Sequence, residues 1–235
     1  MTGQSVVILV KKQYLCRMMN GAIVVVAGES SFAYFAAKLG LNVDVVLVQG
    51  KPLMGNPGNN DSIAGVVLAG CTALYWEMLT MCDVRRRHKV RSLLLIPHDS
   101  TRILDFNLKD IDEEKKYLIT ESLKCCDLMK IDQKEFTAVC RLLGLDSTNH
   151  FDNGFGLMSQ FGIKTLILTH GLRGCHVFHG HAVSEKWGTM NSGIFQTEKG
   201  ESAFLAAYYA ASTKGCRLFS ECHRLALDYM RQLEP

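Results

Sequence analysis

Two carboxylates stand three residues apart at the expected start of a helix, Asp132 and Glu135. Side chains at this spacing share one side of a helix, so the pair is suited to holding a hydrated Mg²⁺ ion beside phosphate groups. The same Asp-x-x-Glu spacing is also that of a capping box, in which both side chains accept from free backbone N–H groups at a helix start. The residues alone leave both interpretations open.

A strand end followed by two glycines forms a second segment, Thr169-His170-Gly171-Leu172-Arg173-Gly174. Glycine lets the backbone approach a ligand closely, and such a turn presents N–H groups to a phosphate or a nucleobase. Thr169, Gly171 and Gly174 are therefore candidate nucleotide contacts. A plain β-turn into the next strand is the alternative.

A third segment, Lys199-Gly200-Glu201-Ser202, opens an alanine-rich helix. A helix start offers free N–H groups and the positive end of the helix dipole, which predicts phosphate contacts for Lys199 and Gly200. Phosphoryl transfer also needs a base that accepts the proton of the attacking hydroxyl. Glu201 supplies a carboxylate and Ser202 a hydroxyl, and successive helical residues point about 100° apart.

The composition is that of an ordinary globular protein, with 235 residues, 48% hydrophobic and 21% charged. It excludes disordered and fibrous classes, and the length suits one domain over residues 1–235. The net charge of +3 is too small to indicate a nucleic-acid or membrane partner. We recognise no bilayer-spanning run, no secretory signal and no CxxC pair among the nine cysteines, so we expect a cytoplasmic protein with reduced thiols.

Short apolar runs rich in Val, Ile and Leu alternate along the chain with segments of helical period. The expected strands are Val6–Val10, Ile23–Ala27, Val43–Val48, Gly65–Ala69, Ser92–Ile96, Leu128–Lys130, Thr165–Thr169 and Cys175–Phe178. The expected helices are Ser30–Leu39, Leu74–Met81, Glu113–Lys124, Lys134–Leu143, Asn153–Phe161, Glu201–Ser212 and Leu218–Leu233. This alternation is typical of an α/β fold, with a mainly parallel sheet covered by helices on both faces.

Two common nucleotide signatures are missing from the sequence. It contains no G-x-x-x-x-G-K-[ST], and the strand Ile23–Ala27 is followed by Gly28-Glu29-Ser30-Ser31 rather than G-x-G-x-x-G. That segment leads into a helix ending Lys38-Leu39-Gly40, and the three segments described above follow it. Their order and spacing resemble those of the ribokinase/PfkB-type carbohydrate kinases over nearly the whole chain.

The resemblance implies a ribokinase-like three-layer αβα sandwich. It implies ATP and Mg²⁺ as cofactors if the protein is active, no cofactor otherwise, and a nucleotide or small metabolite as ligand. It places substrate contacts at Gly28 and Ser31 and a water-mediated Mg²⁺ site at Asp132 and Glu135. Arg102, which follows the expected strand Ser92–Ile96, is a further candidate for a phosphate or sugar contact, with an ordinary exposed arginine as the alternative.

The sequence departs from the family pattern on the substrate side. Where the family has Gly-Ala-Gly-Asp-Ala-Phe, Ser202 takes the position of the catalytic Asp, and Lys199 and Glu201 replace the two glycines. Lys11 follows the first strand, where family members usually carry an Asp that holds sugar hydroxyls. The segment Lys51 to Asp61, rich in Pro, Gly and Asn, stands where the family inserts the strands of a lid, so we expect the lid strands to be absent.

Three functional hypotheses follow from these residues. The first is a degenerate carbohydrate-kinase-like protein that binds a nucleotide or small metabolite with little or no phosphoryl transfer. The second is an active ATP-dependent phosphotransferase that acts on a sugar or similar alcohol with Glu201 as base. The third is a non-catalytic interaction protein that uses an uncovered sheet edge or the basic cluster Arg85–Lys89, whose ordinary interpretation is a solvated helix end. Substrate and oligomeric state stay open.

Overall fold

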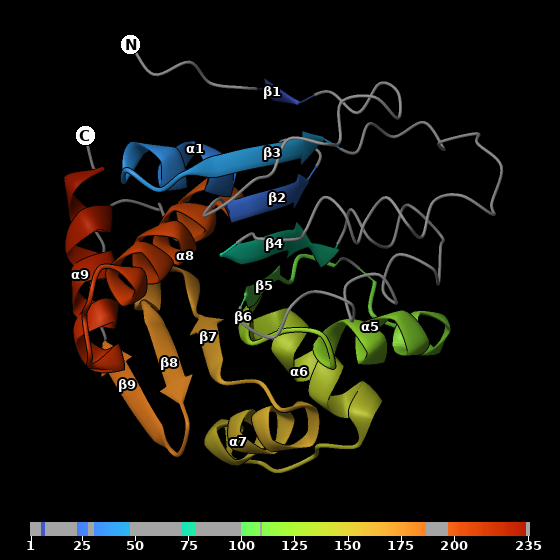
Figure 1. Ribbon diagram of the computed structural model, residues 1–235. Helices are drawn as coiled ribbons and strands as arrows, with labels where there is room; N and C mark the ends of the chain where they lie inside the picture. Colours follow the sequence, from blue (N-terminus) through green and yellow to red (C-terminus); the bar gives the residue numbers. More distant parts are fainter. Residues whose placement is uncertain are drawn as a thin grey trace, which may run out of the picture.

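The computed structural model describes residues 6–7, 23–27, 31–47, 72–78, 100–108, 110–186 and 197–233. A nine-stranded sheet runs through them in the order β1-β3-β2-β4-β5-β6-β7-β8-β9 (Figure 1). The strands are β1 (Val6–Val7), β2 (Ile23–Ala27), β3 (Val43–Leu47), β4 (Ala73–Glu77), β5 (Thr101–Asp105), β6 (Leu128–Asp132), β7 (Thr165–Thr169), β8 (Cys175–His179) and β9 (Ala182–Lys186). Neighbours in this order are parallel from β1 to β7, and the pairs β7–β8 and β8–β9 are antiparallel.

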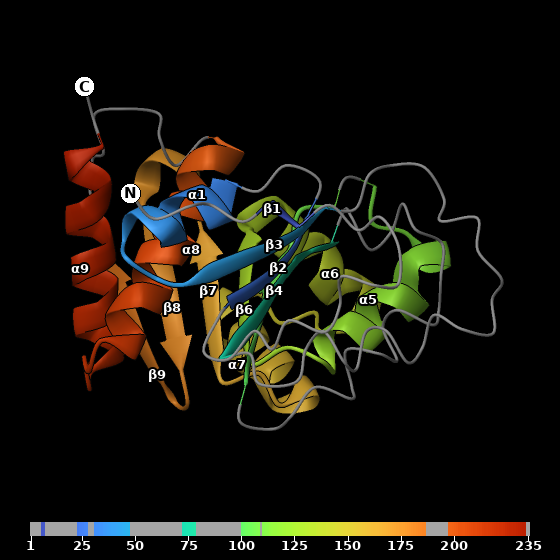
Figure 2. The same cartoon turned by 45° about the horizontal axis from the view of Figure 1, so that its top comes forward.

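Helices cover both faces of this sheet. One face carries α1 (Ser31–Lys38), α8 (Glu198–Thr213) and α9 (Phe219–Gln232), and the other carries α5 (Lys116–Leu123), α6 (Gln133–Leu143) and α7 (His150–Phe161). Two 3₁₀ turns, η1 (Glu113–Lys115) and η2 (Gly171–Arg173), complete the described helical elements. Figures 1 and 2 show the two groups of helices on opposite sides of the strands. The three-layer αβα arrangement expected from the sequence is confirmed.

Side chains of the central strands alternate between two cores. Along β4, Ala73 and Tyr75 pack toward α1 and α8, whereas Leu74 and Trp76 pack toward α5, α6 and α7. Because both faces of the strand are buried, it has no polar side, as is usual for parallel sheets covered by helices.

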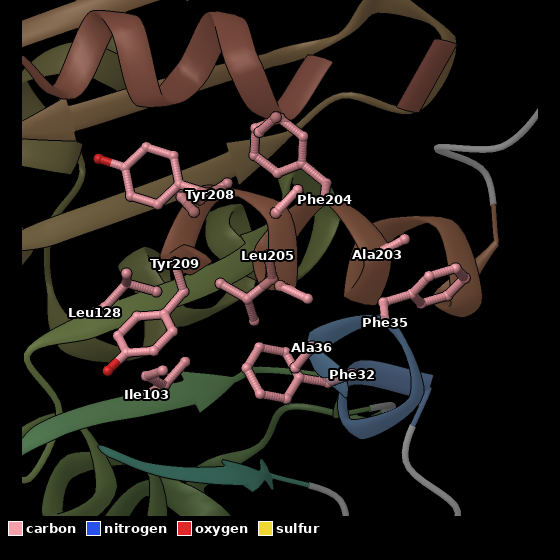
Figure 3. Close-up of a cluster of buried hydrophobic side chains, with 14 of the residues drawn as sticks. Phe32, Phe35, Ala36, Ile103, Leu128, Ala203, Phe204, Leu205, Tyr208 and Tyr209 are labelled. Carbon is pink, nitrogen blue, oxygen red and sulfur yellow. The ribbon is translucent and has the colours of Figure 1, made fainter. Parts of the chain in front are cut away.

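The core beneath α1 and α8 is built from small and aromatic side chains. Figure 3 shows Phe32 and Ala36 of α1 close to Leu205 of α8. It shows Leu128 of β6 and Ile103 of β5 beside Tyr209 of the same helix. Residues 203–210 of α8 are all buried, so this helix lies deep between its neighbours and the sheet. The first turn of α8 is thereby held beside the carboxyl ends of the central strands.

The helix α7 packs directly on the sheet. Asn149 caps its start by accepting a hydrogen bond from the N–H of Phe151 at 3.0 Å, and Gly162 ends it in the left-handed conformation with φ 72°. In its middle, a Cβ atom built on Gly154 would lie 2.7 Å from the ring of Phe178 in β8. The missing side chain at this position is what allows the close approach.

Most elements expected within the described residues are present, with shifts of a few residues at their ends. The helix expected at Leu74–Met81 is wrong over residues 74–77, which form β4, and the strands β5 and β9 were not expected. The expected strands Gly65–Ala69 and Ser92–Ile96 lie outside the described residues.

Two further expectations concern residues that the structure does not describe. The shortened lid region at residues 51–61 and the basic cluster at residues 85–89 both fall there. The single-domain organisation over residues 1–235 stays a prediction. Among the described helices, none combines the length and the apolarity needed to cross a membrane.

Candidate functional site

Four neighbouring parallel strands carry a polar side chain at the middle or in the carboxyl-terminal half of the strand, on the face that α8 covers. Each strand presents an apolar residue to that face and then a polar one nearer its carboxyl end: Ala73 then Tyr75, Ile103 then Asp105, Leu128 then Lys130, and Ile167 then Thr169. Because carboxyl ends of parallel strands meet at one edge of a sheet, the polar residues form one group there.

A buried lysine forms the centre of this group. Lys130 lies beside Asp105 in the register of β5 and β6, and its Nζ is 3.0 Å from Asp105 Oδ1. The same Nζ is 2.5 Å from Glu201 Oε2 in the first turns of α8. The hydroxyl of Thr169 donates to the other oxygen of Glu201, Oε1, at 2.7 Å.

Hydroxyl groups complete the surroundings of Asp105. Its Oδ2 accepts from the phenol of Tyr75 at 2.8 Å and from the hydroxyl of Ser202 at 3.3 Å. The ring of Tyr75 is itself stacked on Phe32 of α1, with centroids 4.1 Å apart. We call Tyr75, Asp105, Lys130, Thr169, Glu201 and Ser202 the charged cluster.

By formal charge, the charged cluster contains one cationic side chain, Lys130, and two acidic ones, Asp105 and Glu201. Burial lowers the pKa of Lys130, but the negative charges of Asp105 and Glu201 raise it by more, so the net shift is upward. Burial, followed by the charge of Asp105, raises the pKa of Tyr75 well above its ordinary value. Lys130 is therefore protonated and Tyr75 is a neutral donor across the ordinary pH range.

The structure directs Glu201 and Ser202 to different partners, in keeping with their helical spacing. The Glu201 carboxylate reaches Lys130 and Thr169, while the Ser202 hydroxyl reaches Asp105. Sequence reasoning found Thr169, Glu201 and Ser202 but missed Tyr75, Asp105 and Lys130. A lysine inside an otherwise apolar strand, Leu-Met-Lys-Ile, was the available signal, because an isolated buried charge requires a partner.

The proposed metal pair forms a capping box at the start of α6. Asp132 Oδ1 accepts from the N–H groups of Lys134 and Glu135, at 2.6 and 2.8 Å. Glu135 accepts from the N–H of Leu108 at 2.7 Å through Oε1 and from the N–H of Asp132 at 3.3 Å through Oε2. Of the two alternatives left open by the sequence, the cap is present in the structure.

These contacts limit how the pair could hold Mg²⁺. Three of the four carboxylate oxygens accept backbone N–H groups, so Asp132 Oδ2 is the oxygen of the pair that no described N–H engages. In the described part of the chain, no group of three His, Cys, Asp or Glu side chains is arranged to bind a metal. The pair therefore fits a hydrated ion held through water better than direct coordination.

Glu135 has an unusual protonation equilibrium. Burial and then the negative charge of Asp132 raise the pKa of its carboxyl from 4.5 to about 7. Lys130 and the two N–H donors offset this shift in part. Near neutral pH the cap is therefore divided between its charged and its neutral form.

The segment Thr169–Gly174 forms the short turn η2 and is tied to the start of α6. Gly171 and Gly174 have φ angles of 60° and 93°, which favour glycine. Gln133 Oε1 lies 3.0 Å from the ring nitrogen Nδ1 of His170 and accepts from Arg173 Nη2 at 3.0 Å. Two of the three segments singled out in the sequence therefore lie side by side.

The remaining predicted contacts have different surroundings. Lys199 is exposed at the start of α8, and the N–H of Gly200 donates to the capping hydroxyl of Thr197 at 3.0 Å. Ser31 begins α1, which packs against α8, and Gly28 lies outside the described residues.

Arg102 lies inside a strand that the sequence does not predict, and the expected strand Ser92–Ile96 before it falls outside the described residues. Arg102 is the second residue of β5, and its guanidinium pairs with Asp127 at 2.8 Å. It lies three residues before Asp105, toward the opposite end of the strand from the charged cluster. Its contact with a phosphate or sugar has no support in this geometry.

A second polar group lies under α9 but is unsuited to chemistry. Cys175 Sγ lies 3.1 Å from His223 Nε2, and His223 Nδ1 lies 3.1 Å from Ser184 Oγ. All three side chains are buried, and burial raises the pKa of the Cys175 thiol far above its ordinary value. A thiol that stays protonated and inaccessible is not a nucleophile.

No family model and no curated protein sequence matches the chain. Solved structures do match. A PfkB protein from Polaromonas sp. JS666 is similar with a TM-score of 0.65 and 12% identity, covering 91% of this chain and 96% of that one. Adenosine kinase from Trypanosoma brucei brucei is similar with a TM-score of 0.65 and 10% sequence identity, covering 90% of this chain and 74% of that one. A fructokinase double mutant from Vibrio cholerae O395 is similar with a TM-score of 0.64 and 12% sequence identity, covering 90% of each chain. That structure has fructose, ADP and potassium bound.

At such low identity, the likeness concerns the fold. The chain has the ribokinase-like α/β fold, and two of the three neighbours described above are kinases by their names, adenosine kinase and fructokinase. The resemblance to the ribokinase/PfkB-type kinases noted in the sequence thus extends to the three-dimensional structure.

Proposed function

We propose that this protein is a degenerate carbohydrate-kinase-like protein. It binds a nucleotide or a small metabolite at the carboxyl ends of β5, β6 and β7, and it transfers phosphoryl groups slowly or not at all. The observation that carries the proposal lies at the start of α8, where Glu201 is bound to Lys130 and Ser202 offers only a hydroxyl.

The first support is the missing base. Ser202 stands at the position where the resemblance places a catalytic Asp, and a serine hydroxyl does not accept a proton at neutral pH without an activating base. Its neighbour Asp105 already accepts from Tyr75 and Lys130. The carboxylate of Glu201 is held through both oxygens, so it would have to leave Lys130 and Thr169 before it could take a substrate proton.

The second support is the preserved nucleotide side. The glycine turn Gly171–Gly174 and the acidic start of α6 are brought together by Gln133. The Asp132 and Glu135 pair suits a hydrated Mg²⁺ ion, and the turn has the backbone conformation that lets a phosphate approach. The two sides of the site therefore differ, with nucleotide contacts kept and the base lost.

Thermal unfolding with and without nucleotide tests binding. Millimolar ADP or ATP with Mg²⁺ is expected to raise the melting temperature saturably, because a ligand that binds only the native state stabilises it. Lys199→Ala is expected to reduce this rise, because Lys199 lies exposed at the start of α8. Lys214→Ala, at the far end of the same helix, is the matched control and is expected to leave it unchanged.

Turnover of ATP with a panel of sugars and alcohols tests transfer. The wild-type protein is expected to give no acceptor-dependent ADP release above the buffer rate. The absence of any thermal shift would overturn the binding half of the proposal. Acceptor-dependent turnover that disappears in Glu201→Gln would instead establish the active kinase with Glu201 as base.

A further inference from the structure

The carboxylate of Glu201 lies among donors that the sheet supplies. Lys130 Nζ is 2.5 Å from one of its oxygens and the hydroxyl of Thr169 is 2.7 Å from the other. The side chain of Lys130 is 4% exposed and that of Glu201 is 13% exposed. Glu201 also lies in the first turns of α8, where the helix dipole favours a negative charge.

The donors do not depend on Glu201 for their place in the fold. Asp105 pairs with Lys130 directly across β5 and β6, at 3.0 Å, and the hydroxyls of Tyr75 and Ser202 also bind Asp105. Without Glu201, Lys130 and Asp105 would remain as a neutral pair. The second side of the ammonium would then lack an acceptor among the described residues, and the Thr169 hydroxyl would keep only its long contact of 3.5 Å with the carbonyl of Ile131. An unsatisfied buried donor is costly.

We propose that Lys130 and Thr169 form an oxyanion site and that Glu201 fills this site from within the chain. The carboxylate takes the place of a carboxylate- or phosphate-sized group of a ligand. Such a group reaches Lys130 only when Glu201 is removed or moves out, so the wild-type chain occupies its own anion site. This proposal deepens the proposed function, because the anion site adjoins the expected nucleotide contacts. Only the identity of the natural ligand rests on the proposed function; the anion site itself does not.

Replacement of the tethered anion by a free one tests the proposal. Glu201→Ala removes the carboxylate and leaves room for a small anion, whereas Glu201→Gln fills the same volume without charge and serves as the matched control. Glu221→Ala removes an exposed carboxylate paired with Arg224 on α9 and controls for general salt effects. Melting temperatures are measured in sodium formate, acetate, phosphate and chloride at equal ionic strength.

The melting temperature of Glu201→Ala in chloride is expected to lie below that of the wild type. In at least one of the oxyanions it is expected to be roughly 3 to 6 °C higher than in chloride, and this rise is expected to saturate with anion concentration. The wild type, Glu201→Gln and Glu221→Ala are expected to show no such difference. If Glu201→Ala does not fold in chloride, Glu201→Ser is measured in the same way. Melting temperatures of both variants that are independent of the anion, or an equal oxyanion effect on Glu201→Gln, would overturn the proposal.

The two proposals fail separately. Wild-type protein that does not respond to nucleotide, together with a Glu201→Ala variant rescued by formate, would remove the proposed function and keep the anion site. If nucleotide stabilises the wild type but no anion stabilises the Glu201 variants, the anion site is removed and the proposed function is kept.

Discussion

At the scale of single residues, Lys130 decides how the candidate site is held together. It is the cation of a buried cluster that contains two carboxylates, and three hydroxyl groups supply the remaining donors. Buried ion pairs are often no more stabilising than apolar side chains of the same volume, but removal of one partner leaves an uncompensated charge. The cluster is therefore better explained by a role in the site than by stability.

Lys130→Met tests the dependence of the cluster on its cation. Two buried carboxylates would then face each other without a cation, and we expect the free energy of unfolding to fall by at least about 3 kcal/mol. Urea denaturation measures it. Lys164→Met is the control, because Lys164 is 70% exposed in its pair with Asp127, and a change within about 1 kcal/mol is expected. Equal losses in the two variants would show that the Lys130 pairs are no stronger than a surface contact.

Glu135 predicts a pH dependence of stability. Its pKa is 4.5 in ordinary surroundings and about 7 in the fold. Between these values the folded protein binds more protons than the unfolded chain, so stability falls as the pH rises from 4.5 to 7 and is constant for this group above and below that window. The contribution is up to about 3 kcal/mol. Urea denaturation of the wild type and Glu135→Gln across this window measures it, and only the wild type is expected to show this loss. Parallel pH profiles would contradict the prediction.

At the scale of elements, helices were more predictable than strands, for a physical reason. Helix caps and helical periodicity are properties of neighbouring residues in the sequence. The helix α6 can therefore be predicted from Asp132 and Glu135 at its start and from the glycine at its end. The sequence of β4, Ala-Leu-Tyr-Trp, does not predict a strand, because a strand buried on both faces has no polar face and no period-2 signal. β5 was missed because its Arg102 and Asp105 are satisfied by partners far along the chain.

The contact between α7 and β8 gives a prediction at this scale. Gly154→Ala would place a Cβ atom 2.7 Å from the ring of Phe178, so the helix or the ring must shift. In Gly156→Ala, on the same helix, the nearest atom is a flexible methyl group of Leu145 at 3.3 Å. Since both changes gain the same helix propensity, we expect Gly154→Ala to be less stable by roughly 1 to 3 kcal/mol in urea denaturation. A more stable Gly154→Ala variant would show that α7 does not press on the sheet.

At the scale of the molecule, the site exists only where distant segments meet. Ser202 and Asp105 are 97 residues apart in sequence, and Thr169 and Glu201 are 32 apart. The sequence predicted the residues that stand in local motifs, including Thr169, Glu201 and Ser202. It did not predict Asp105 or Tyr75, because their roles depend on strand register, which no local pattern specifies.

Moving the carboxylate from position 201 to position 202 tests whether the first turns of α8 and the ends of the strands form one interacting site. Ser202→Asp alone would bring a third carboxylate within reach of Asp105, and we expect a loss of about 2 kcal/mol or more. Glu201→Ala with Ser202→Asp keeps the net charge of the cluster, so the double variant is expected to be more stable than the sum of the two single changes by about 1 to 3 kcal/mol. A double-mutant cycle by urea denaturation measures this coupling.

The pair Ser202→Asp and Glu221→Ala provides the control for the cycle. Glu221 lies on the exposed side of α9, and its change is expected to add to Ser202→Asp within about 0.5 kcal/mol. The same additivity for Glu201→Ala and Ser202→Asp would show that carboxylates at positions 201 and 202 do not interact through the charged cluster.

The alternation of β4 also separates two optical probes of this protein. Trp76 is fully buried toward α5–α7, and the other tryptophan, Trp187, lies outside the described residues. Tyr75, its neighbour in the strand, is buried on the opposite face with a pKa raised well above that of a free phenol. The contribution of Trp76 to the emission therefore reports on one layer. The contribution of Tyr75 to the phenolate absorbance, one of seven tyrosines, reports on the other and is expected only when the layer over the charged cluster opens.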